Sequence, residues 1–246
     1  MKQIKRLISK IEEQQAVYYA LKEGEDGTVC FKEFQNGEWG TDDANYVNRL
    51  RLAYYLLYCH IEDEAVVVYL FEEELKDRER NSFQGIGSTL RILTQLIRKY
   101  NGDGKYNGLL ERAKNANFDC ACGYDPDAEV EDDLESSSLL DCICLCREME
   151  YREVMGILVD EWKKETAEWT NSSRRMLIDF NAFLGRDAEN ERLYQEQLAE
   201  VLSAESSSTR DIVSGYKNLI RYYLDMGDYE KAHCLCEKVI RDTDYQ

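Results

Sequence analysis

The sequence predicts an all-α protein of stacked antiparallel helical hairpins. Proline occurs once and glycine 14 times in 246 residues, whereas β-rich and loop-rich folds use both residues at their turns. From residue 43 onward, apolar residues recur three and four positions apart, the spacing that places them on one face of a helix. Turn residues interrupt this pattern roughly every 40 residues, which is typical of repeats whose hairpins bury their apolar faces against each other.

The segment before residue 43 departs from this pattern. Its apolar residues predict one amphipathic helix that continues to residue 21: Ile4, Leu7, Ile8, Ile11, Val17, Tyr18 and Leu21. Residues 24–40 break the helical spacing, and residues 28–34 predict a short strand before the turn-forming pair Asn36-Gly37. We therefore expect one small β or loop excursion near residues 28–39.

Five pairs of helical patterns follow, at residues 46–75, 88–113, 139–162, 177–202 and 212–240. Residues 65–75 are apolar on almost all sides, so we expect this helix near the centre. Residues 1–118 are expected to hold the N-terminal helix, the β excursion and two hairpins. Residues 119–137 are expected to form an acidic loop, and residues 138–246 to hold three hairpins, the whole making one continuous solenoid-like domain.

The apolar runs and the cysteines of the sequence indicate in which cellular compartment the protein works. No run of about 18 apolar residues occurs, and the N-terminus has no apolar block like that of a signal peptide. The number of cysteines, nine, is odd, and several of them are separated by a single residue within predicted helices. Both observations favour reduced thiols over disulfides. We expect a cytoplasmic protein that does not act at a membrane.

The charge balance is strongly acidic, with 49 Asp and Glu against 31 Lys and Arg, or -18 net. Such a surface repels a phosphate backbone, so we expect no nucleic-acid partner. It attracts a basic protein, although acidic surfaces also serve solubility alone.

Acidic residues concentrate where basic ones are missing, because residues 115–146 contain no Lys or Arg. Crowded carboxylates resist compaction, so this stretch predicts an exposed loop. It is either a contact for a basic partner or a solubilising loop. The candidate partner-binding residues in it are Asp125, Asp127, Glu129, Glu131, Asp132, Asp133 and Glu135.

A calcium-binding loop is the other use of alternating carboxylates. The loop would need a central Gly where this chain has Val130, and a Glu at its last position where it has Ser136. We therefore expect no calcium site.

The last hairpin, residues 216–232, resembles a tetratricopeptide repeat. It has Tyr216, Leu219 and Tyr223 at the family's spacing, followed by Gly227-Asp-Tyr-Glu-Lys-Ala232 across the turn. The resemblance implies that Gly227 closes the first helix in the left-handed conformation, that Tyr229 packs back on the hairpin and that Ala232 lets the helices approach closely. The chain departs from the family at three positions: Ile220, Cys236 and Asp244.

Proteins of this family bind peptides or partner helices in a concave groove lined by the first helix of each repeat. The resemblance implies that Lys217, Arg221 and Asp225 face such a groove. The alternative is that these three residues form an ordinary solvated helix face.

Residues with catalytic or metal-binding chemistry do not form a recognised motif. Cysteines two apart on a helix point about 200° apart, so they do not share a metal readily. A zinc site at Cys120 and Cys122, which fall in the predicted loop, stays open. His60 and His233 each adjoin a cysteine, but neighbours on a helix point away from each other.

These observations favour a non-enzymatic, cofactor-free protein that binds a protein or peptide partner through a groove and an acidic surface. The alternative is an inhibitor that neutralises a basic bacterial toxin, as immunity proteins and antitoxins do, since those proteins are also small, acidic and helical. A metal-dependent enzyme is the third hypothesis.

Overall fold

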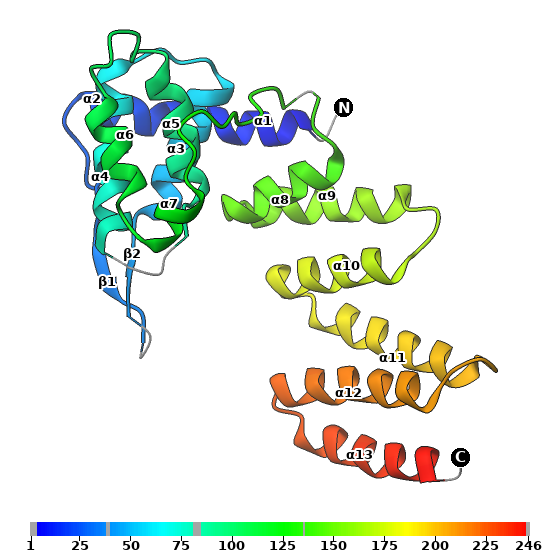
Figure 1. The fold of residues 1–246 in the computed structure, drawn as a ribbon. Helices are drawn as coiled ribbons and strands as arrows, with labels where there is room; N and C mark the ends of the chain where they lie inside the picture. The colour runs from blue at the N-terminus through cyan, green and yellow to red at the C-terminus, as the bar shows by residue number, and fades with distance from the viewer. Residues whose placement is uncertain (1–3, 38–39, 81–84, 135, 245–246) are drawn as a thin grey trace. The chain divides into compact units, whose positions relative to one another are not determined.

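The computed structural model describes residues 4–37, 40–80, 85–134 and 136–244 and has an all-α fold, as the sequence predicts (Figure 1). The chain divides into two compact units, Met1–Trp162 and Lys163–Gln246. The boundary between the units therefore lies after Trp162, whereas the sequence analysis divided the chain at the acidic loop, residues 119–137. None of the described helices is both long enough and apolar enough to cross a membrane.

The first unit contains two short strands and most of the helices. They are α1 (Ile4–Glu12), α2 (Gln15–Lys22), β1 (Glu33–Gln35), β2 (Thr41–Asp43), α3 (Tyr46–Tyr58), α4 (Glu64–Arg80), α5 (Ser88–Arg98), α6 (Asn107–Lys114), α7 (Phe118–Gly123), α8 (Leu139–Glu148) and α9 (Arg152–Glu165), the last of which runs past the boundary between the units.

Helices α3, α4 and α5 form the core of the first unit, and each packs against the other two. Most of the residues that they bury are apolar, for example Leu50, Phe71 and Leu93, each inaccessible to solvent. Helix α6 packs against α4. The predicted second hairpin, residues 88–113, therefore has its helices in the expected places but is not a self-contained pair.

The single N-terminal helix that we expected is two helices. Helix α1 ends at Glu12, the amide of Gln14 bonds to the carbonyl of Ile11 at 3.0 Å in a tighter turn, and α2 starts at Gln15. Helix α1 packs on both α3 and α8, whereas α2 packs on α3. The apolar spacing correctly predicted helical structure in this segment. It does not encode the bend between α1 and α2, which lets the two helices pack on different partners.

A small β excursion is present, but it lies later than predicted. Strands β1 and β2 pair antiparallel, with Glu33 opposite Asp43. Residues 28–30 are not a strand, because tertiary contacts with side chains take over their carbonyls. Val29 is fully buried and its carbonyl accepts from Arg49, while the Asn45 amide donates to the carbonyl of Cys30 at 2.8 Å.

A buried ion network ties this excursion to α3 and α4. The guanidinium of Arg49 lies 2.6 Å from the carboxylate of Asp43 and 2.8 Å from that of Glu74, and all three side chains are inaccessible to solvent. Arg78 lies 3.0 Å from the other oxygen of Glu74 and also pairs with Asp77. Burial raises the pKa of Glu74, and the two arginines oppose that shift by stabilising its ionised form.

The second unit is a stack of antiparallel helices. It contains α10 (Asn171–Leu184), α11 (Asp187–Ser203), α12 (Thr209–Asp225) and α13 (Tyr229–Asp244). Each helix packs against the next one. Helices α11, α12 and α13 share a core of Leu198, Ile212, Tyr216, Leu219, Tyr223 and Ala232. Here the chain forms the stacked hairpins that the sequence predicts.

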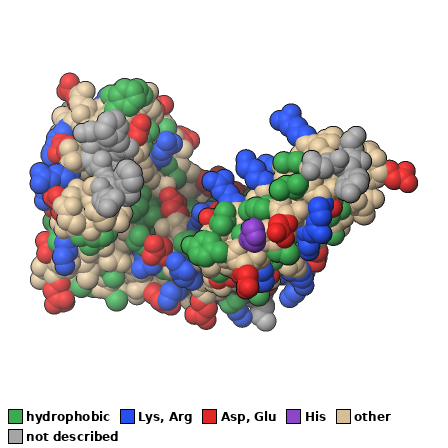
Figure 2. Space-filling view, turned by 90° about the horizontal axis from the view of Figure 1, so that it is seen from below, with side chains coloured by type: hydrophobic (Ala, Val, Ile, Leu, Met, Phe, Trp, Pro, Cys, Tyr) green, Lys and Arg blue, Asp and Glu red, His purple; other side chains and the backbone are tan. Residues whose placement is uncertain are grey.

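The last hairpin confirms two of the three expected residue roles. Gly227 has a left-handed φ of 73°, and the next amide, Asp228, bonds back to the carbonyl of Tyr223 at 2.8 Å. Ala232 is buried between the helices. The expectation for Tyr229 is wrong, since 71% of it is exposed. Figure 2 shows hydrophobic side chains beside charged ones on the outward side of α13.

Candidate partner-binding site

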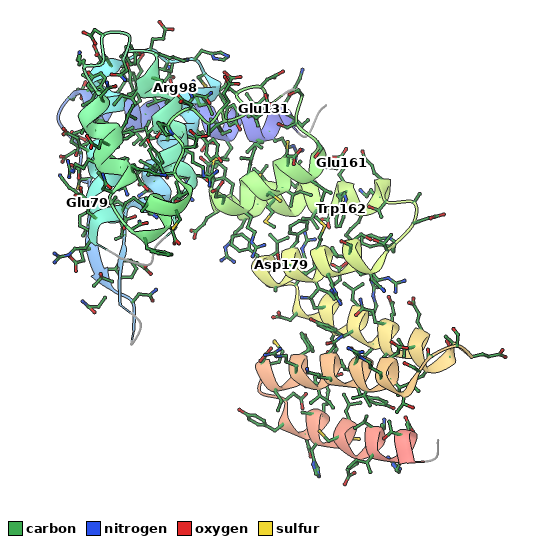
Figure 3. The ribbon with its side chains drawn as sticks, viewed as in Figure 1. Glu79, Arg98, Glu131, Glu161, Trp162 and Asp179 are labelled. Atoms are coloured by element: carbon green, nitrogen blue, oxygen red, sulfur yellow. The ribbon has the colours of Figure 1, made fainter. Side chains whose placement is uncertain are left out.

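The acidic segment, residues 124–134, is an exposed loop, as the sequence predicts, and it is anchored to the first unit. The Gln95 side chain of α5 donates to the carbonyl of Val130 at 3.0 Å and accepts from its amide, and Arg98 donates to the carbonyl of Ala128 at 3.2 Å (Figure 3). Tyr124 and Leu134 are buried at its two ends. The backbone is therefore held in place while its carboxylates face solvent.

The predicted loop, residues 119–137, starts later in the structure than we expected. Residues 118–123 are helix α7, capped by Asn117, whose side chain accepts from the amide of Cys120 at 2.8 Å. Cys120 is buried and Cys122 is exposed, so the two thiols face different surroundings. Among the described residues, no group of three or more His, Cys, Asp or Glu side chains is arranged to hold a metal ion.

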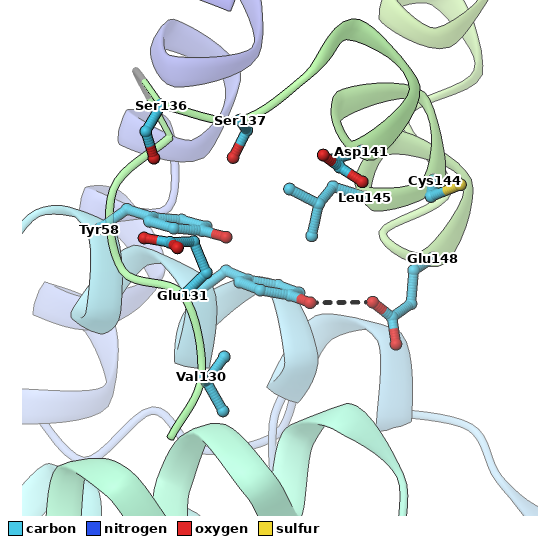
Figure 4. A pocket seen from close by; sticks show the side chains of 10 residues that line it. Tyr58, Val130, Glu131, Ser136, Ser137, Asp141, Cys144, Leu145 and Glu148 are labelled. Atoms are coloured by element: carbon cyan, nitrogen blue, oxygen red, sulfur yellow. Dashed lines mark hydrogen bonds between the residues drawn. The ribbon is translucent and has the colours of Figure 1, made fainter. Parts of the chain in front are cut away.

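A groove of about 560 Å³ lies between α3, the acidic segment and α8; we call it the tyrosine groove (Figure 4). Its lining residues are Tyr54, Tyr58, Val130, Glu131, Ser136, Ser137, Asp141, Cys144, Leu145 and Glu148. Three of these carry a carboxylate, and among the described lining residues there is no Lys or Arg. The groove therefore combines aromatic surface with negative charge.

Tyr54 and Tyr58 form the aromatic wall of the groove. They stand one turn apart on α3, with ring centroids 5.5 Å apart and planes 3° from parallel. The Tyr54 hydroxyl donates to Glu148 on α8 at 2.9 Å. Tyr54 is buried, whereas Tyr58 is only half-buried. Burial, together with the charge of Glu148, raises the pKa of both phenols, so both stay neutral at physiological pH.

The carboxylates of the groove are held by neighbouring groups. Asp141 accepts from the Ser138 hydroxyl at 2.6 Å in the capping box that starts α8. Glu131 accepts from the amide of Asp133 at 3.1 Å. With Glu148 fixed by Tyr54, each of the three acids has at least one oxygen in a defined position.

The predicted acidic residues are distributed around this site. Glu131 lines the tyrosine groove, while Asp132 and Asp133 line a second hollow that shares Tyr58 with it. Glu129 lies with Asp132 beside Arg98 and Lys99. Asp125 lies beside Lys114 and Pro126. Asp127 is exposed, and Glu135 lies outside the described residues.

The other predicted binding residues belong to the second unit. Lys217, Arg221 and Asp225 are all exposed on α12. A polar hollow in this unit is lined on α12 by other residues, Asp211, Ser214, Gly215 and Asn218. The use of the three predicted residues as a peptide groove stays a prediction.

Sequence reasoning missed Tyr54, Tyr58, Asp141 and Glu148 as site residues. Tyr54 and Tyr58 lie in the predicted helical pattern of residues 46–75, and an aromatic pair one turn apart was a signal available in the sequence. Asp141 lies in the stretch without Lys or Arg, residues 115–146, but was not among the candidate residues. Nothing in the sequence indicates that α8 lies opposite α3.

The surroundings of Cys59 disfavour a role for this thiol as a nucleophile. Burial raises the pKa of Cys59 next to His60, and the charge of Glu12 raises it further. A nucleophilic thiol requires the opposite shift, since the thiolate is the reactive form.

Comparison with protein-family models, curated protein sequences and solved structures found no match to this chain. A functional proposal for it therefore depends on the geometry of its own residues.

Proposed function

We propose that this protein is a non-enzymatic binding module that holds a basic segment of a protein partner along the tyrosine groove and the acidic segment. The observation that carries the proposal is the groove itself, where two parallel tyrosine rings share a hollow with three carboxylates. A cation placed there gains ionic contacts and contact with an aromatic ring together.

The magnitudes favour a peptide over a lone ion. A cation beside an aromatic ring contributes about 0.5–2 kcal/mol, depending on how far it is desolvated. Several such contacts along an extended segment are needed to reach micromolar affinity, which corresponds to about 8 kcal/mol. The carboxylates of Glu129, Asp132 and Asp133, which neighbour the groove in the anchored segment, extend the negative surface over that length.

The anchoring of the acidic segment also supports the proposal. A loop that becomes ordered only on binding loses affinity to the entropy of ordering, whereas a backbone already bonded to Gln95 and Arg98 does not. A segment serving solubility alone has no need of these bonds.

The test uses fluorescent peptides of about 12 residues, one rich in Arg and Lys, one neutral and one acidic, with binding followed by anisotropy. We expect the basic peptide alone to bind, and its association to slow as salt rises from about 50 to about 300 mM. The variant Glu131→Gln with Glu148→Gln should weaken binding about tenfold. Its control, Glu230→Gln with Glu237→Gln, makes the same charge change at exposed positions of α13 and should leave binding within about twofold.

Equal losses in the two double variants would show that only net charge matters and would remove the groove from the proposal. Equal binding of the neutral peptide would contradict the proposed basic partner.

A further inference from the structure

Tyr58 is the ring of the aromatic pair that remains partly accessible in the groove. One side of its ring faces Tyr54, it is half-buried, and it lines both the tyrosine groove and the neighbouring hollow. Among the described residues, Lys or Arg groups lie over the rings of Tyr18, Tyr46, Tyr106, Tyr151 and Tyr223. Tyr58 has the same kind of ring, surrounded by carboxylates, and the described part of the chain places no such cation over it.

We propose that the tyrosine groove recognises an arginine side chain of the partner, with its guanidinium against the open face of Tyr58 and its N–H groups donating to Glu131. This inference rests on the proposed function and names the side chain that the site selects. Figure 4 shows the carboxylates of Glu131 and Glu148 on opposite sides of the aromatic pair.

The combination of an open ring with a carboxylate beside it favours a guanidinium. Its donors spread in a plane, so they can reach a carboxylate at the edge of a ring while the flat face stacks on that ring. An ammonium is compact and more strongly hydrated, so it loses more hydration on entering a half-buried site.

The chain contains a buried example of this arrangement. The guanidinium of Arg78 lies 5.3 Å from the ring centroid of Tyr46 and 3.0 Å from Glu74, with 5% of its side chain exposed. The lysine counterpart, Lys231 with Tyr223 and Glu191, has 52% of its side chain exposed. In this protein the buried pairing of a ring with a carboxylate therefore holds an arginine, whereas the exposed pairing holds a lysine.

The test titrates the whole protein with N-acetyl-arginine methylamide and with the corresponding lysine and citrulline compounds, followed by amide chemical shifts. We expect the arginine probe to bind in the millimolar range and at least about fivefold more tightly than the lysine probe. Citrulline, which has the shape of arginine without the charge, should not bind. Shifts should concentrate at residues of α3, α8 and the acidic segment.

The variants Tyr58→Leu and Glu131→Gln should each abolish the preference for arginine. Tyr19→Leu on α2 and Glu230→Gln on α13 are the matched controls, at positions outside the groove and the acidic segment. Thermal unfolding checks each variant. If Tyr58→Leu does not fold, Glu131→Gln, which changes an exposed side chain, decides the outcome.

Equal affinity for the arginine and lysine probes would overturn the inference. So would a failure of both probes to bind while the basic peptide still binds in a way that depends on Glu131 and Glu148, and in that case the proposed function stands. If neither the probes nor the basic peptide binds, both the inference and the proposed function fail.

Discussion

Arg49 is fully buried, and every partner of its guanidinium comes from another element. It is bonded to Glu74 of α4 and Asp43 of β2, and it donates to the carbonyl of Val29 at 3.2 Å. A buried ion pair is not itself a strong source of stability, because desolvation offsets the attraction. Removing one partner is strongly destabilising, because it leaves the other charges buried without a counter-charge or water to stabilise them.

The variant Arg49→Met should therefore lower the free energy of unfolding by about 3–5 kcal/mol. Arg80→Met is the control, because Arg80 pairs with Glu33 at 2.9 Å with 63% of its side chain exposed, and that loss should be far smaller. Urea unfolding followed by circular dichroism measures both. Similar losses in the two variants would show that the buried network has no special role in the first unit.

The ends of the helices show how local conformation is chosen at the level of elements. Helices α8 and α12 end with the same kind of backbone bond: the amide of Tyr151 donates to the carbonyl of Cys146, and the amide of Asp228 to the carbonyl of Tyr223, each at 2.8 Å. The left-handed position is Gly227 after α12 but Glu150, with φ 55°, after α8. A side chain with a Cβ is strained in this conformation by about 1–2 kcal/mol, whereas glycine is not.

Replacing Glu150 with Gly should stabilise the protein by about 0.5–1 kcal/mol, after the extra freedom of the unfolded chain is subtracted. The control is Glu153→Gly, the same exchange at an exposed position within α9, where glycine is expected to destabilise by a similar amount. Thermal unfolding should move the two midpoints in opposite directions. A lower midpoint for Glu150→Gly would mean that the Glu150 side chain makes a compensating contact.

At the scale of the whole molecule, the net charge is -18, yet some of the carboxylates stabilise the fold by bonding one helix to another. Glu191 of α11 accepts from Lys231 of α13 at 3.0 Å and from the Tyr223 hydroxyl of α12 at 2.9 Å. These bonds from Lys231 and Tyr223 lower the pKa of Glu191. The bond from Arg174 likewise lowers the pKa of Glu200, and both residues lie in the second unit.

The lowered pKa of Glu191 predicts a pH dependence of stability. Because the folded pKa lies below that of the unfolded chain, the stabilisation is present above the usual Glu range and is lost as pH falls through the folded value. Glu191→Gln should be less stable than the natural protein at pH 7, and the difference should shrink below about pH 4. Urea unfolding at both pH values measures it. A difference that is constant with pH would show that the carboxylate charge is not the cause.

The sequence by itself determined which residues form helices and which faces of them are apolar, because both depend on spacing along one chain. It predicted the helical hairpins of the second unit, the left-handed turn at Gly227 and the concentration of acidic residues in one segment. It also predicted a β excursion, although the buried carbonyl of Val29 placed that excursion later along the chain.

Only the tertiary structure decided which helices meet, and with it the candidate site. Tyr58 and Glu148 are 90 residues apart in the sequence, and they share a groove because α3 and α8 both pack on α1. The bonds from Gln95 and Arg98 hold the predicted exposed loop in place as a wall of that groove. Periodicity encodes the direction of each helix face but not the partner that covers it, because many partners bury the same apolar area equally well.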